Sequence, residues 1–109
     1  MGKFVAGEIV VLPFPQTNLQ SGKRHPALVV ANFAGNDIIL CQITSQIRSD
    51  PYSVTLTPAD IAKGGLAMQS YARINRLFTV EESVIVYGAA RVTDAKLAEV
   101  RDAIRQMFT

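Results

Sequence analysis

Two apolar runs decide the fold: Pro26-Ala27-Leu28-Val29-Val30-Ala31 and Ile38-Ile39-Leu40-Cys41-Gln42-Ile43-Thr44. Both are rich in aliphatic residues, and both are apolar at successive positions instead of alternate ones. That pattern is typical of a strand buried on both faces. The turn residues Gly35-Asn36-Asp37 lie between the two runs. The two runs therefore predict two neighbouring central strands of a β-sheet.

Shorter segments extend this sheet in both directions along the chain. A first strand is predicted at 8–12, where Pro13 stops it. Polar and apolar residues alternate at 53–57, which predicts a strand with one solvent-facing side. Further strands are predicted at 68–79 and 84–89.

Two helices are also predicted. Thr57-Pro58-Ala59-Asp60 has the residues of a helix start, and Gly64-Gly65 would end that helix soon afterwards. A longer amphipathic helix is predicted from Asp94 to Met107, with Thr93 as its N-cap. Six or so strands with such a helix predict a mostly β fold. We expect a small SH3-like barrel with a short internal helix and a C-terminal amphipathic helix.

Length and composition predict one globular domain over residues 1–109, because 49% of the residues are hydrophobic and 18% are charged. The single cysteine, Cys41, lies in an apolar run and is interpreted as a buried, inert thiol. With no internal disulfide possible, a reducing cytoplasm is the expected compartment. No apolar run approaches the roughly 18 residues of a membrane span. A net charge of only +2 means that an anionic ligand must be recognised by local charges.

Four segments occur in a distinctive order. Gly7-Glu8-Ile9-Val10 precedes a Pro-containing loop and Pro26-Ala27-Leu28-Val29-Val30, Ile43-Thr44-Ser45-Gln46 ends the third strand, and Ser70–Thr79 forms a later block. In order and spacing they resemble the MazF/PemK/Kid toxins of type II toxin–antitoxin systems. The resemblance extends over nearly the whole chain.

The resemblance implies a fold and an activity. The fold would be an SH3-like barrel that forms a homodimer. The activity would be metal-independent, sequence-specific cleavage of single-stranded RNA, such as mRNA, that leaves 2′,3′-cyclic phosphate and 5′-hydroxyl ends. No cofactor would be needed, and a cognate antitoxin would cover the RNA groove.

Metal-free RNA cleavage needs a proton acceptor, a group that neutralises the phosphate, and a proton donor for the leaving oxygen. The predicted catalytic residues are Arg24, His25, Thr44 and Arg76. The resemblance implies the last two, because Thr44 matches a catalytic-site threonine of the family and Arg76 matches an arginine beside its active groove. The family has an Arg directly before the Pro that opens the second strand, whereas this chain has His25 there and Arg24 one step earlier. An imidazole exchanges protons near neutral pH and so suits acid–base work. No His/Cys/Asp cluster has metal-ligand spacing, so no metal site is expected.

Polar and cationic residues of the two long loops and the later block are expected to bind RNA. They are Gln16, Thr17, Asn18, Lys23, Gln46, Arg48 and Arg73. Arg73 and Arg76 are three positions apart, so in a regular strand they lie on opposite faces and only one would face the RNA.

Two other functions remain open. The first is a non-catalytic binding module on the same scaffold, for example a CcdB-like inhibitor of DNA gyrase, and the unusual His25 favours it. The joint presence of Arg24, His25, Thr44 and Arg76 favours the ribonuclease, because a pure binder does not need all four. The second is a housekeeping barrel with no toxin role.

Overall fold

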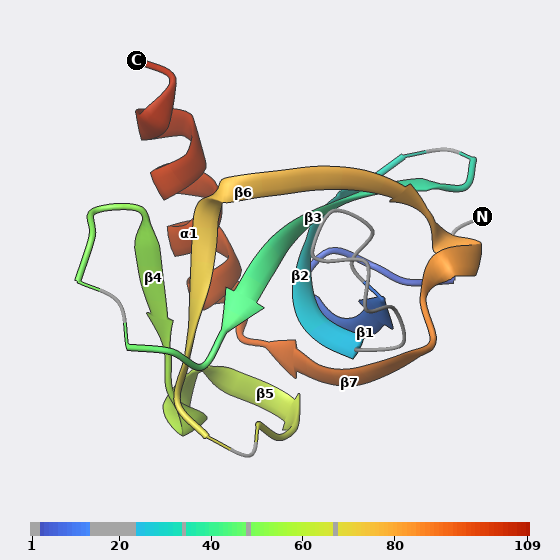
Figure 1. Cartoon of the computed structure of the whole chain (residues 1–109), viewed down its shortest axis with the longest axis horizontal. Helices are drawn as coiled ribbons and strands as arrows, with labels where there is room; N and C mark the ends of the chain where they lie inside the picture. The colour runs from blue at the N-terminus through green and yellow to red at the C-terminus, as the bar shows by residue number, and fades with distance from the viewer. Residues whose placement is uncertain (1–2, 14–23, 34, 48, 67) are drawn as a thin grey trace.

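The computed structural model describes residues 3–13, 24–33, 35–47, 49–66 and 68–109 (Figure 1). Within these residues, seven strands form one antiparallel sheet in the order β4-β6-β3-β2-β1-β7-β5. The strands are β1 (Glu8–Pro13), β2 (Arg24–Asn32), β3 (Asp37–Thr44), β4 (Ser53–Leu56), β5 (Ile61–Gly64), β6 (Ser70–Glu81) and β7 (Tyr87–Val92). The sheet is strongly curled, and the α-helix α1 (Asp94–Met107) packs against one side (Figure 1). The mostly β fold and the central positions of β2 and β3 confirm the prediction.

The sheet is covered on both faces, which explains why β2 and β3 are apolar at successive positions. One cluster of buried residues faces α1 and includes Ile9, Leu28, Cys41, Ile43, Leu56, Ala72 and Val100. A second cluster lies inside the curl and includes Val10, Leu12, Ala27, Val29, Ile38 and Leu40. Burial of this apolar surface is the main favourable term in folding.

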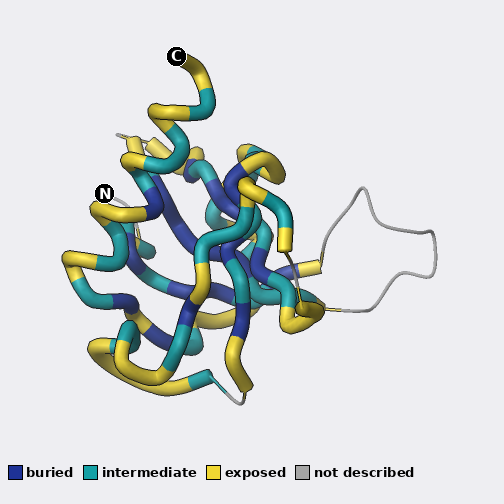
Figure 2. The backbone as a smooth tube through the Cα atoms, turned by 90° about the vertical axis from the view of Figure 1, so that its left-hand side faces the viewer, coloured by how far each residue is buried: buried dark blue, intermediate teal, exposed yellow. Residues whose placement is uncertain are grey.

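Helix α1 begins and ends where the sequence predicts. Thr93 Oγ1 accepts a hydrogen bond from Lys96 N at 3.1 Å, which satisfies one of the free amides at the helix N-terminus. Arg101 Nε donates to Val30 O of β2 at 3.0 Å and so fixes the helix to the sheet. Figure 2 shows the exposed residues of the helix recurring along its outer side. No helix of the described ranges is long and apolar enough to cross a membrane.

Strand β6 bends sharply near its middle (Figure 1). Gln42 of β3 lies opposite Arg73, but the preceding Cys41 lies opposite Leu77. Residues 74–76 are therefore extra residues of β6 with no counterpart on β3. Such a bulge bends a strand and interrupts the alternation of its side chains.

The predicted helix beginning at Thr57 is wrong beyond its first turn. Residues Pro58–Asp60 form a 3₁₀ turn, and the chain then becomes β5, where Ile61 pairs with Val92 of β7. Gly64 has a φ of +77°, and a Cβ there would lie 2.5 Å from Ala89 O. Gly64 therefore allows close strand contact and does not end a helix.

The strand predicted at 84–89 begins later than expected. Residues Glu82–Val84 form a second 3₁₀ turn, and β7 covers Tyr87–Val92, beside β1 and β5. The apolar pattern predicted the strand itself, but its bounds depend on its pairing with those two strands.

Candidate active site

A cavity of about 530 Å³ lies where β2 begins and β3 ends. Its described lining comes from β2, β3, β6 and the two segments that follow β3 and β5. The lining residues are His25, Pro26, Gln42, Ile43, Thr44, Ser45, Gln46, Leu66, Met68, Ser70 and Arg73.

The strand register explains why the polar side chains of the cavity lie together. Gln42 lies opposite Ala27 of β2 on one side and opposite Arg73 of β6 on the other. Residues directly opposite each other in an antiparallel pair share a face of the sheet, as do residues two apart in one strand. His25 is two residues from Ala27, and Thr44 is two residues from Gln42. The side chains of His25, Gln42, Thr44 and Arg73 are therefore on one face.

The same face is apolar further into the curl. Val10 and Leu12 of β1 lie opposite Ala27 and His25, and both are fully buried. The face therefore changes from apolar to polar at the end of β2 and β3 where the cavity lies. The apolar part holds the strands in position, and the polar part lines the cavity.

The charges around the cavity suit an anion. Arg73 and His25 line it, and no Asp or Glu is among its described lining residues. A guanidinium donates two parallel hydrogen bonds to a phosphate or carboxylate. The described lining therefore combines a cation, an imidazole and hydroxyl groups without an opposing carboxylate.

Thr44 presents its hydroxyl at the end of β3. Its Oγ1 accepts a hydrogen bond from Gln46 N at 3.2 Å, which closes a tight turn after the strand. A hydroxyl that accepts one hydrogen bond still has its own hydrogen to donate. Thr44 is half-buried, so this hydrogen lies within reach of a ligand in the cavity.

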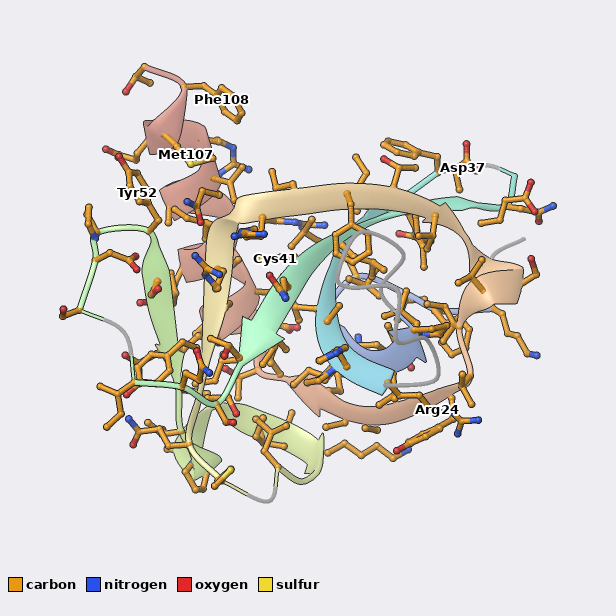
Figure 3. All side chains as sticks on the ribbon, in the orientation of Figure 1. Arg24, Asp37, Cys41, Tyr52, Met107 and Phe108 are labelled. Atoms are coloured by element: carbon orange, nitrogen blue, oxygen red, sulfur yellow. The ribbon has the colours of Figure 1, made fainter. Side chains whose placement is uncertain are left out.

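Cys41 supports the backbone beside the cavity. Its Sγ donates to Arg73 O at 3.0 Å, at the point where the register between β3 and β6 shifts. Burial raises the pKa of the Cys41 thiol to about 12, and the nearby charge of Arg73 opposes this rise only in part. The thiol is fully buried and stays protonated, so it is structural and not a nucleophile. Figure 3 shows Cys41 within the sheet.

The structure brings together four of the predicted site residues, namely His25, Thr44, Gln46 and Arg73. Arg24 and Arg76 are exposed and are not among the residues that line the cavity. Figure 3 shows Arg24 well apart from Cys41. The other predicted RNA-binding residues, Gln16, Thr17, Asn18, Lys23 and Arg48, lie outside the described residues.

Sequence reasoning missed Gln42. It is half-buried and lines the cavity between Ala27 and Arg73. The available signal was a single carboxamide within an otherwise apolar strand, two residues before Thr44. Alternation along the strand places such a residue on the same face as Thr44.

No group of three or more His, Cys, Asp or Glu side chains that could hold a metal ion occurs in the part of the chain that the structure describes. The polar groups of the cavity are instead an imidazole, a guanidinium, carboxamides and hydroxyls. A guanidinium is cationic and does not bind a metal ion, and the described lining offers one imidazole and no carboxylate or thiolate.

In its described residues the chain is a small, curled β-sheet with a C-terminal helix and a cavity whose lining suits an anion. Residues 6–108 match the family described as the PemK-like, MazF-like toxin of type II toxin–antitoxin systems. The chain belongs to this toxin family. A comparison with curated protein sequences found no match.

Solved structures of related proteins have the same fold. MazF from Deinococcus radiodurans is 26% identical with a TM-score of 0.72, and the alignment covers 95% of this chain and 94% of that one. A MazE–MazF structure from the same organism gives 26% identity and a TM-score of 0.75, with the same coverage. An endoribonuclease from a mycobacterial species, in complex with its cognate antitoxin, is 18% identical with a TM-score of 0.73. The alignment covers 95% of this chain and 93% of that one.

Proposed function

We propose that this protein is a metal-independent endoribonuclease that cuts single-stranded RNA in the cavity at the ends of β2 and β3. The observation that carries the proposal is the shared face of His25, Thr44 and Arg73, with no carboxylate among the described lining residues. Membership of the toxin family supports it.

Each side chain has a role in this chemistry. His25 takes the proton from the ribose 2′-hydroxyl, whose oxygen then attacks the adjacent phosphorus. Arg73 neutralises the charge that develops on the phosphate oxygens, and Thr44 donates a hydrogen bond to one of them. The bond between phosphorus and the 5′-oxygen breaks, and that oxygen takes a proton from the imidazolium. The products are a 2′,3′-cyclic phosphate and a 5′-hydroxyl, and no water or metal takes part in the step.

We also infer that the protein acts in the cytoplasm as a homodimer and that an antitoxin binds it and blocks the RNA site. Solved relatives in complex with an antitoxin support the antitoxin part of this inference. Exposed apolar side chains on and just before β7 offer surface for a protein partner, since Val84, Val86 and Tyr87 are 40%, 44% and 51% exposed.

The test is cleavage of a long single-stranded RNA by the purified protein in excess chelator, followed by mapping of the ends. We expect cleavage at a short motif, with cyclic phosphate and 5′-hydroxyl ends. Cleavage that disappears with chelator would contradict the metal-independent mechanism. Absence of cleavage under every condition would favour the binding module, and binding to DNA gyrase would then be measured.

A further inference from the structure

The carboxamide of Gln42 lies on the wall of the cavity. Gln42 Oε1 is buried and has no hydrogen-bond partner among the described residues. Burying an acceptor without a partner costs folding free energy, and most buried polar atoms in proteins are paired. Such an atom on the wall of a ligand cavity indicates that the ligand supplies the missing donor.

Of the two sheet neighbours of Gln42, only Arg73 carries side-chain donors, and no described donor reaches Gln42 Oε1 in the structure. On β2 it lies opposite Ala27, whose side chain has no polar group. On β6 it lies opposite Arg73, whose charge is matched to the phosphate in the proposed reaction. Thr44, two residues along β3, is on the same face. The carboxamide therefore lies next to the groups proposed to hold the scissile phosphate.

The partner of this oxygen must be a hydrogen-bond donor, which excludes phosphate oxygens. An RNA base offers such a donor beside the phosphate. Among base donors, an exocyclic amino group projects furthest from the ring and so reaches a buried acceptor best. A carboxamide also matches an amino group with a neighbouring ring nitrogen, because it accepts from one and donates to the other.

We propose that Gln42 determines cleavage specificity by accepting a hydrogen bond from the exocyclic amino group of an RNA base next to the scissile phosphate. This inference rests on the proposed ribonuclease function. It makes Gln42 a recognition residue, separate in role from the catalytic His25, Thr44 and Arg73.

The test combines a variant with altered substrates. After the cleavage motif is mapped, a short RNA is made in which each amino-bearing base is replaced in turn by its analogue without that group. Purine riboside replaces adenosine, zebularine replaces cytidine, and inosine replaces guanosine. We expect one replacement to lower kcat/KM of the wild-type protein at least tenfold. In Gln42→Met the same replacement should change kcat/KM less than threefold, because the interaction is already lost.

Gln106→Met on α1 is the matched control, since Gln106 is exposed and does not line the cavity. It should discriminate between the substrates as the wild-type protein does. Gln42→Ser provides the same comparison in case Gln42→Met does not fold, as judged by circular dichroism.

Three outcomes overturn the proposal while cleavage itself persists: a motif without any amino-bearing base, a wild-type protein that tolerates every replacement, or a Gln42 variant that still discriminates tenfold. Absence of cleavage by the wild-type protein would instead overturn the proposed function, and this inference with it.

Discussion

Replacing Arg73 by methionine should slow RNA cleavage far more than replacing Arg76. Methionine keeps much of the length of the side chain and removes its charge. Arg73 is half-buried, and it is the only Lys or Arg among the described residues that line the cavity. No described cation of the lining can therefore replace it. Losing one preorganised donor to a developing oxyanion costs about 10²–10³ in rate, or roughly 3–4 kcal/mol, and we expect Arg73→Met to fall in this range.

The assay is single-turnover cleavage of a short RNA that contains the mapped motif. Arg76→Met is the matched control, because Arg76 is exposed and lies outside the cavity lining. Its rate should stay within about threefold of wild type, as is usual for an exposed charge far from the reacting atoms. Arg73→Lys should cleave faster than Arg73→Met but slower than wild type, since lysine keeps the positive charge but cannot donate a bidentate pair of hydrogen bonds.

A large loss in Arg76→Met together with a normal rate in Arg73→Met would refute the assignment from geometry. It would mean that the bend in β6 brings Arg76 to the phosphate when RNA binds. Thermal unfolding of each variant separates a loss of catalysis from a loss of folded protein.

Four further outcomes are expected. His25→Ala should slow cleavage about 10²-fold or more if the imidazole accepts the proton, and an unchanged rate in the same assay would move that role to Arg24. Above pH 9 an unfolded chain loses the Cys41 proton that the folded protein, with its pKa of about 12, keeps. The free energy of unfolding should therefore fall by up to about 1.4 kcal/mol per pH unit between pH 9 and 12, and urea titrations at several pH values should show no such slope in Cys41→Ala. Thr93→Ala removes the hydroxyl that caps α1 and should cost about 1 kcal/mol in urea denaturation; an unchanged midpoint would show that the cap contributes nothing. Leu28→Ala, at a fully buried position between β1 and β3, should cost about 2–5 kcal/mol in the same measurement, and a cost below 1 kcal/mol would contradict its place in the core.

Much of the fold was predictable because its main signals are local. The continuous apolar runs of β2 and β3 indicate strands covered on both faces, and α1 has a capping residue and a regular apolar stripe. β5 was not predictable in this way. Its four residues include a single half-buried one, Ile61, and they are held by pairing with β7, which is distant in sequence. The local helix signal at Thr57 was correct for one turn, and long-range pairing determined the rest.

Part of the lining of the candidate site could be predicted from the sequence. Thr44 follows from its place at the end of β3 and from the family resemblance, and His25 from its place before Pro26 in the same family motif. The choice between Arg73 and Arg76 was not predictable, because strict alternation assumes a regular strand. The three extra residues of β6 exist only relative to the register of β3, and that register is a property of the folded sheet.

The buried thiol of Cys41 can serve as a natural probe of local opening of the fold. Cys41 is the only cysteine of the chain, and its Sγ is bonded to the carbonyl of Arg73. A thiol reagent can modify it only when the packing of α1 and the neighbouring strands around the sulfur opens. The modification rate therefore reports how often this part of the core opens, without any introduced label. If RNA or an antitoxin holds these strands together, its binding will be measurable as a slower reaction at this one sulfur atom.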